Sequence, residues 1–170
     1  MDTLSNTDSS SLIIRKATRD DAEAVLRLVD ALAEYEKLDP PDAAARARLV
    51  NDMSGEKPRF DAYLAEIERT PVGYAFVFET YSSFLALPTL YLEDLFILPE
   101  YRDKKVGYAL FRAMVSEANR RGCGRMEWAV LDWNQLAIDF YRRLGATHMK
   151  EWQLYRLVRS DMERILNIPS

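Results

Sequence analysis

The chain has 170 residues, of which 48% are hydrophobic and 29% charged, an ordinary mix for a soluble globular protein with one core. Its formal net charge of −4 disfavours a nucleic-acid binder, because such proteins usually carry a basic face, and suits a cationic small substrate. The single cysteine, Cys123, and the single histidine, His148, exclude an internal disulfide, a cysteine-based zinc site and a histidine-rich metal site.

The first ten residues are polar and lack the basic and apolar regions of a signal peptide. We therefore expect a disordered tail over residues 1–10, followed by one domain over residues 11–170. No apolar run approaches the length of a membrane span. These features predict a cytoplasmic protein with neither a membrane nor a nucleic acid as partner.

The first half of the chain predicts a strand, two helices and a β-hairpin. Thr18, followed three positions later by Asp21, is typical of a capping box at a helix start. Apolar residues then recur at helical spacing until the Pro40-Pro41 pair approaches, and Pro41 and Asp42 can begin a second helix. The predicted elements are a strand at 11–16, a helix from Thr18 to about Lys37, a helix at 41–53, and strands at 61–67 and 72–81 joined by the turn 68–71.

The second half predicts a buried strand, two helices with clear ends, and further strands. The buried strand carries Glu93 and Asp94 near its middle. Gly122 ends one helix, and a second is capped by Asn134 and ended by Gly145. The predicted elements are strands at 89–98, 125–131, 147–150 and 152–159, and helices at 106–121, 134–144 and 161–166.

This order of elements favours one α/β domain with a mixed sheet. It does not alternate as a doubly wound dinucleotide fold does, and no glycine-rich dinucleotide fingerprint is present.

The segment Arg102–Gly107 leads from the buried strand into a helix. A helix N-terminus offers unpaired N–H groups and the positive end of its dipole, and Lys104 and Lys105 add positive charge. We interpret the segment as a candidate diphosphate site, although the loop by itself is more readily explained as a solvated basic turn. Likewise, the Asn134 helix with Tyr141 could be an ordinary amphipathic helix.

Taken together, these segments resemble the GNAT superfamily of N-acetyltransferases, and within it the diamine group formed by the spermidine/spermine and thialysine Nε-acetyltransferases. The resemblance covers nearly the whole chain. The matching residues are Leu28–Glu36 with Tyr35-Glu36, Tyr91–Phe96, Tyr101-Arg102, Val106-Gly107, Asp132–Asn134, Phe140-Tyr141 and Gly145-Ala146.

The resemblance implies a GNAT fold, with a mostly antiparallel sheet of about six to seven strands flanked by about four helices, and acetyl-CoA as co-substrate without a metal. It implies a bulge that splays the strand near Leu95–Ile97 and frees backbone groups for the pantetheine arm. The implied cofactor-binding residues are Leu95, Phe96, Ile97, Arg102, Asp103, Lys104, Lys105, Val106, Gly107, Tyr108, Asn134, Ala137, Tyr141 and Arg143.

The implied chemistry is direct transfer of an acetyl group to an amine, which must be neutral to attack the thioester. Glu93 assists deprotonation, Tyr141 protonates the leaving thiolate, and a backbone N–H near Leu95–Ile97 holds the oxyanion. Asp94 follows Glu93 in the strand, so we expect it on the opposite face as a structural hydrogen-bonding acid. Cys123 is interpreted as an inert structural thiol.

The amine of the diamine group is held by acidic and aromatic side chains, and the group forms homodimers through its C-terminal strands. A homodimer is therefore the expected assembly. The matching substrate-binding positions are Tyr35, Glu36, Glu93, Glu127, Trp128 and Glu151, of which Trp128 could instead be core.

The cofactor loop departs from the family pattern, because Asp103 and Lys105 stand where glycines are usual. Glycine allows close approach and unusual dihedral angles, so we expect weaker and more salt-sensitive CoA binding. The leading hypothesis is acetylation of a small polyamine or lysine-like amine. Two further hypotheses are acetylation of a protein N-terminus or another amine such as an aminoglycoside, and a non-catalytic CoA-binding module.

Overall fold

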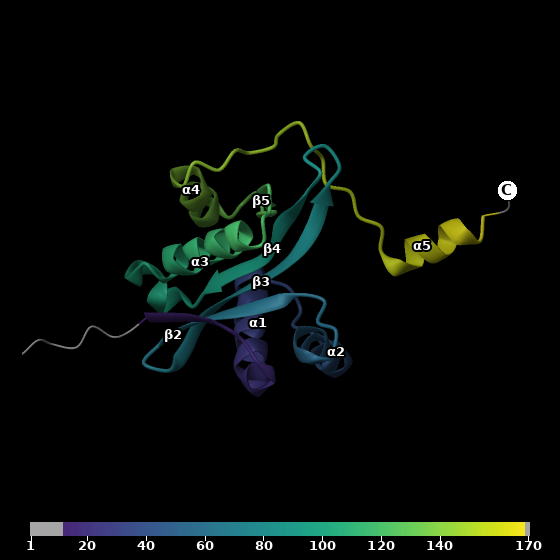
Figure 1. The fold of residues 1–170 in the computed structure, drawn as a ribbon. Helices are drawn as coiled ribbons and strands as arrows, with labels where there is room; N and C mark the ends of the chain where they lie inside the picture. The colour runs from purple at the N-terminus through teal and green to yellow at the C-terminus, as the bar shows by residue number, and fades with distance from the viewer. Residues whose placement is uncertain (1–11, 169–170) are drawn as a thin grey trace, which may run out of the picture. The chain divides into compact units, whose positions relative to one another are not determined.

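Across residues 12–168, described by a computed structural model, five strands form one mixed sheet in the order β1-β2-β3-β4-β5 (Figure 1). The first four strands pair antiparallel, and β4 and β5 pair parallel. The strands are β1 (Leu12–Lys16), β2 (Asp61–Ile67), β3 (Thr70–Ser82), β4 (Leu87–Ile97) and β5 (Arg125–Glu127). The α-helices are α1 (Ala22–Glu36), α2 (Ala43–Ser54), α3 (Val106–Arg120), α4 (Gln135–Arg143) and α5 (Arg159–Leu166), and 3₁₀ helices lie at Arg19–Asp21 and Pro99–Lys104.

The chain divides into two units after Ala129. The first unit holds the whole sheet with α1, α2 and α3, and the second holds α4 and α5. The predicted α/β class with a mixed, mostly antiparallel sheet is confirmed, with five strands described. The predicted tail, residues 1–10, lies outside the described residues.

The sheet of the first unit is covered on both faces. Helix α1 lies behind the strands in Figure 1 and α3 in front of them. Behind the sheet, Leu28 of α1 and Met53 of α2 pack in one buried cluster with Tyr74 and Phe96. In front, Leu110 and other buried residues of α3 pack on β3 and β4. Residues of β3 are accordingly buried without interruption from Val72 to Val77.

The predicted helix boundaries follow from local hydrogen bonding. The Asp21 carboxylate accepts from the Thr18 N–H at 2.7 Å, which confirms the capping box ahead of α1. The Asp42 carboxylate accepts from the Ala45 N–H at 2.7 Å and begins α2. The predicted ends of α3 and α4 are confirmed too, because Gly122 and Gly145 follow those helices at φ values of 69° and 83°, a region that favours glycine.

Part of the predicted strand content is wrong. Strand β5 ends at Glu127, so residues 128–131 of the predicted strand are outside the sheet. The predicted strands 147–150 and 152–159 are not strands in the structure. Their β-branched and aromatic residues favour the extended conformation of a strand. A strand must also pair with a neighbour through backbone hydrogen bonds, and these segments pair with no strand in the described range.

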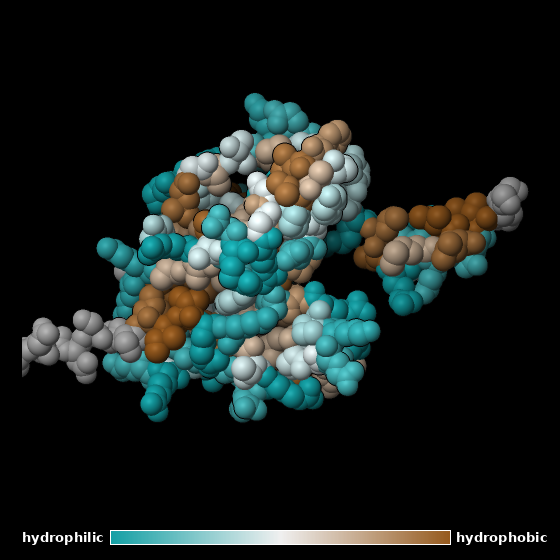
Figure 2. Space-filling model, viewed as in Figure 1, coloured by the Kyte–Doolittle hydropathy of each residue, from teal (hydrophilic) through white to brown (hydrophobic). Residues whose placement is uncertain are grey.

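The second unit, described by itself, consists of two short helices and the chain between them. In α5, Met162, Ile165 and Leu166 recur at helical spacing, and Figure 2 shows apolar atoms gathered along this helix. Nowhere between residues 12 and 168 is a helix long and apolar enough to cross a membrane.

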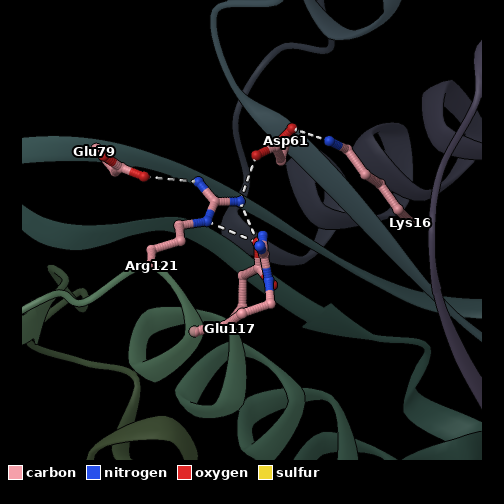
Figure 3. Close-up of polar contacts among 6 residues, drawn as sticks. Lys16, Asp61, Glu79, Glu117 and Arg121 are labelled. Atoms are coloured by element: carbon pink, nitrogen blue, oxygen red, sulfur yellow. Dashed lines mark hydrogen bonds and ion pairs between the residues drawn. The ribbon is translucent and has the colours of Figure 1, made fainter.

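An ion-pair network around Arg121 ties the C-terminal end of α3 to three strands of the sheet (Figure 3). Its guanidinium lies 2.5 Å from Asp61 of β2, 2.7 Å from Glu117 of α3 and 3.3 Å from Glu79 of β3. Lys16 of β1 lies 2.5 Å from the same Asp61. The Arg121 side chain is only 14% exposed, so its charge depends on these partners.

The network lowers the pKa values of two carboxyl groups. Hydrogen bonds from Arg120 and Arg121 hold the pKa of Glu117 at about 2. Burial opposes ionisation of Asp61, but hydrogen bonds from Lys16 and Arg121 prevail and lower its pKa. Since both folded-state pKa values lie below the unfolded ones, this stabilisation is present at neutral pH and is lost as the pH falls through them.

We predict that Arg121→Gln lowers the free energy of unfolding by about 2 kcal/mol at pH 7, because Asp61 and Glu117 each lose a charged hydrogen bond from a largely buried cation and keep only Lys16 and Arg120. The difference from the wild type should shrink as the pH falls from about 5 toward 2. Denaturant unfolding at several pH values measures both effects. Arg120→Gln is the matched control, because Arg120 also pairs with Glu117 but is 70% exposed, and its loss should be much smaller. Equal losses in the two variants would contradict this account.

Candidate active site

Strand β4 contains a β-bulge at Glu93, a residue of the candidate site. In the register of β3 and β4, Phe76 pairs with Asp94 and the next β3 residue, Val77, pairs with Leu92. Glu93 is therefore an extra residue in β4 without a partner in β3. A bulge in β4 was predicted from the resemblance, and it lies just before the expected segment Leu95–Ile97.

The bulge corrects the prediction that Asp94 lies on the opposite face from Glu93. Strict alternation would separate the two side chains, but the extra residue interrupts the alternation, and both line the same pocket. The expected hydrogen-bonding role of Asp94 is present as well, since the Tyr74 hydroxyl donates to its Oδ2 at 3.2 Å.

The pocket lies within the first unit, between the C-terminal part of α1, α2 and the sheet, and has a volume of about 730 Å³. This volume is typical of small-molecule sites. Its walls are largely apolar and aromatic, with Leu32, Leu49, Phe60, Phe76 and Phe78 among them. Its acidic side chains are Glu36, Asp39, Glu93 and Asp94. Such a pocket suits a small cation with an apolar stem.

Two of these acids hold protons more readily than ordinary carboxyl groups. Burial, the neighbouring Glu93 charge and, to a smaller extent, Glu36 raise the pKa of Asp94 to about 6, against the opposing hydrogen bond from Tyr74. Burial also raises the pKa of Glu36. Glu93 itself is exposed. The pocket thus has a partly buried carboxyl that can take up a proton beside an exposed one.

The loop after β4 has an unusual backbone at the position where the family pattern has glycine. Lys105, directly before α3, adopts φ 59° and ψ 14°, a left-handed conformation that glycine accepts more readily. Arg102 is fixed at the end of β4, where its Nε donates to the Ile97 carbonyl at 3.1 Å and its guanidinium lies 4.4 Å from the centre of the Tyr35 ring.

The start of α3 leaves room for a ligand. A methyl group placed on Gly107 would meet only Ile97 Cγ1, at 3.7 Å, which is an ordinary contact. The protein's own packing therefore does not require glycine here. The first turn of α3 also supplies N–H groups and a positive dipole end, which are the elements of an anion site.

The edge of β4 that faces β5 is open beyond the bulge. Strand β5 pairs only with Thr89–Tyr91, so no described strand pairs with this edge from Leu92 to Ile97. The backbone of Leu95–Ile97 thus lies at an edge without a neighbouring strand, as the resemblance predicts for the segment that pairs with pantetheine.

In the second unit, Asn134 caps α4 as predicted. Its side-chain oxygen accepts from the Ala137 N–H at 3.2 Å. Tyr141 lies in the same helix with its ring centre 5.2 Å from that of Phe140, and burial raises the pKa of Tyr141 to about 12. Its hydroxyl is therefore protonated at neutral pH. Arg143 is the last residue of α4.

Several predicted substrate-binding residues do not line the pocket. Tyr35 stacks on Arg102, and Glu127 in β5 pairs with Arg125 at 3.0 Å. Trp128 packs edge-on against Phe111 of α3, with ring centres 5.5 Å apart. Glu151 belongs to the second unit. Of the predicted substrate residues, the structure brings Glu36 and Glu93 together in the pocket.

Other pocket residues escaped the sequence analysis. Asp39 follows α1, and Arg59 precedes β2, in connecting segments without a recognisable motif. Asp94 was assigned to the wrong face. Strand alternation alone does not locate a bulge, and the resemblance places one at Leu95–Ile97, after Asp94, so neither signal predicted the face on which Asp94 lies.

Comparison with known proteins assigns the chain to a family. The profile of the Acetyltransferase (GNAT) family matches residues 23–146, most of the chain. The chain belongs to the GNAT acetyltransferase family. Thialysine N-epsilon-acetyltransferase of Sus scrofa is 34% identical over 167 residues, covering 92% of this chain and 98% of that protein. L-ornithine N5-acetyltransferase of Arabidopsis thaliana is 44% identical over 121 residues, covering 69% of this chain and 53% of that protein.

A likeness in structure agrees with this assignment. An aminoglycoside N-acetyltransferase solved in complex with CoA has the same fold, with a TM-score of 0.73 and 21% identity, and the alignment covers 89% of this chain and 97% of that chain. Family membership and the named relatives make the chain an acetyl-CoA-dependent acyltransferase.

We predict that Lys105→Gly raises the free energy of unfolding by about 0.5 to 1 kcal/mol. It relieves a left-handed conformation that costs a side-chain-bearing residue about 1–2 kcal/mol, partly offset by the greater freedom of glycine in the unfolded chain. Denaturant unfolding measures the change. Lys104→Gly is the control, since Lys104 is outside the left-handed region and should lose stability. A gain in both variants, or in neither, would refute the role of the backbone conformation.

We also predict opposite shifts in the pKa of Asp94 from its two neighbours. Glu93→Gln should lower this pKa, because a repelling charge is removed. Tyr74→Phe should raise it, because the carboxylate loses a hydrogen bond. Titration of the Asp94 carboxyl by carbon NMR measures both. Shifts of the same sign would show that the two neighbours do not act on Asp94 as described.

Proposed function

We propose that the enzyme transfers the acetyl group of acetyl-CoA directly to a primary amine of a small polyamine or lysine-like substrate. The observation that carries this proposal is the pocket, in which Glu36, Glu93 and Asp94 converge within apolar walls. An amine with an aliphatic stem matches both features. The named activities of the relatives on thialysine and ornithine support the same class of substrate.

In the proposed reaction, the substrate ammonium first gives up a proton, directly or through water, with assistance from Glu93 at the bulge. The neutral nitrogen attacks the thioester carbonyl, and a backbone N–H from Leu95–Ile97 stabilises the oxyanion. As the carbon–sulfur bond breaks, Tyr141 donates its proton to the thiolate. A tyrosine hydroxyl is protonated at neutral pH, which this role requires.

The proposed cofactor site is the start of α3 with the open edge of β4. The pyrophosphate would bind at Arg102–Gly107, with Tyr108 beside it in the first turn, and the pantetheine arm along Leu95–Ile97. Asn134, Ala137 and Arg143 complete the proposed set from the resemblance. The open space at Gly107 and the unpaired β4 edge support this placement within the first unit.

We further propose that residues 11–170 act as one catalytic domain, in a cytoplasmic homodimer. The family profile extends across the boundary between the two units, which supports a common function for them.

We predict that the purified protein, given acetyl-CoA and a panel of amines, forms a monoacetylated small amine detectable by mass spectrometry.

Glu93→Gln and Tyr141→Phe should each lower kcat by about 10²-fold or more, as loss of a general base or acid does. Glu127→Gln is a control acid outside the pocket. Wild-type rates in both variants would refute the assigned roles. Measurable CoA binding without any acetylated product would favour a non-catalytic CoA-binding module. Acetylation of peptides alone would indicate a protein N-terminus as the substrate, and acetylation of aminoglycosides alone would indicate an aminoglycoside.

Gly107→Ala should separate cofactor binding from folding. The variant should fold with equal or higher stability, because the added methyl group has room and alanine favours a helix, yet bind acetyl-CoA about tenfold more weakly if the cofactor approaches this backbone. Calorimetric titration measures the affinity, and repeating it at high salt tests the electrostatic contribution of Lys104 and Lys105. Unchanged affinity would place the cofactor elsewhere.

A further inference from the structure

Arg59 is the one basic side chain among the described residues that line the pocket. The other charged groups there are the four carboxyls of Glu36, Asp39, Glu93 and Asp94. A pocket that served only polycations would gain nothing from a cation in its wall, because Arg59 would repel the second ammonium of a diamine. This single basic residue therefore indicates a ligand that carries an anionic group as well as an amine.

The strand register separates Arg59 from the acids of the bulge. Asp94 of β4 pairs with Phe76 of β3, which in turn pairs with Ala62 of β2. Since neighbouring strands lie about 4.8 Å apart, β4 and β2 are separated by roughly 10 Å at this level. Arg59 lies three residues before Ala62, at the β2 side of the pocket.

The floor between these two sides is apolar. The ring of Phe60, next to Arg59 in the chain, lies with its centre 4.6 Å from that of Phe76. A ligand that spans the pocket would thus lay an aliphatic stem over aromatic rings, with the acids of β4 at one end and the guanidinium of Arg59 at the other.

The guanidinium of Arg59 can bind a ligand at little energetic cost, because its existing ion pair is weak. Its Nε lies 3.4 Å from Oδ1 of Asp52, and the Arg59 side chain is 79% exposed. An exposed ion pair of this kind is worth little, so a ligand carboxylate can compete with Asp52 or share the guanidinium with it. Arginine also matches the planar shape of a carboxylate through paired N–H donors.

We infer that Arg59 is a specificity-determining residue that binds the carboxylate of an amino acid whose basic side chain is acetylated. This inference rests on the proposed function and narrows it, because it selects lysine-like amino acids over simple polyamines. The side-chain ammonium lies toward Glu93 and Asp94, and the carboxylate lies at Arg59. A diamine of the same length has the amine but not the anion, and it meets Arg59 as a repelling charge.

The experiment compares substrates that differ only in the carboxylate: ornithine with putrescine, and lysine with cadaverine. The wild type should show a higher kcat/KM for the amino acid of each pair, with the acetyl group on the side-chain nitrogen by mass spectrometry. Arg59→Gln should lower the ratio of kcat/KM for the amino acid to that for the diamine by about threefold to fivefold, the effect of losing a largely exposed ion pair. Arg59→Lys should retain part of the preference, and Arg59→Glu should reverse it. Arg48→Gln, an exposed arginine of α2 outside the pocket, is the control for net charge.

The outcomes separate this inference from the proposed function. Acetylation of both classes with the same ratio in wild type and Arg59→Gln overturns the role of Arg59 while the proposed function stands. If the wild type acetylates none of the four probes, the proposed substrate class fails. In that case calorimetric titration with ornithine and with putrescine still tests the role of Arg59, because Arg59→Gln must weaken the binding of ornithine more than that of putrescine. Equal or absent binding of the two overturns the inference.

Discussion

The extra residue in β4 is the constraint on which the site depends. By inserting Glu93 between Leu92 and Asp94 in the register with β3, the bulge turns two consecutive acids toward one pocket. It also raises the electrostatic cost of ionising the second acid, because Asp94 is partly buried and now has Glu93 as a neighbour on the same side. Without the bulge, one of these carboxyls would face α3 across the other face of the sheet, and the pocket would lose one of its paired acids.

A bulge weakens a ladder, so the remainder of the sheet must hold the strands together. Strand β3 pairs along nearly its whole length with β4 and is buried on both faces over its central residues. The Arg121 network joins α3 to β2 and β3, and Lys16 of β1 pairs with the same Asp61. Ion pairs and strand pairing thus hold β1, β2 and β3 together. The edge of β4 beyond Tyr91, in contrast, has no neighbouring strand among the described residues.

The sequence predicted those features that depend on local patterns. These features depend only on residues close together in the chain, and all are present in the structure. They are the capping box at Thr18, the helix starts at Asp42 and Asn134, and the glycines with positive φ at Gly122 and Gly145. The predicted strands 147–150 and 152–159 failed because pairing is not a local property. Because pairing between strands is not a local property, only part of the site was predicted from the sequence. Glu36 and Glu93 were found through the family resemblance, whereas Asp94 was misplaced by alternation, and Arg59 reaches the pocket only because β2 folds beside β3.

The charge pattern of the pocket couples ionisation to binding. Burial keeps the pKa of Asp94 near 6 and raises that of Glu36, so the empty pocket takes up protons more readily than exposed acids do. In the proposed reaction, an entering ammonium favours the charged form of Asp94, and it therefore binds best where that carboxyl is already ionised, above about pH 6. Once the ammonium proton has passed to Glu93 or to water, the neutral amine no longer stabilises the charged carboxyls, and the pKa of Asp94 returns toward about 6. In the proposed reaction, the two acids that the bulge brings together thus serve both capture of the cation and its deprotonation.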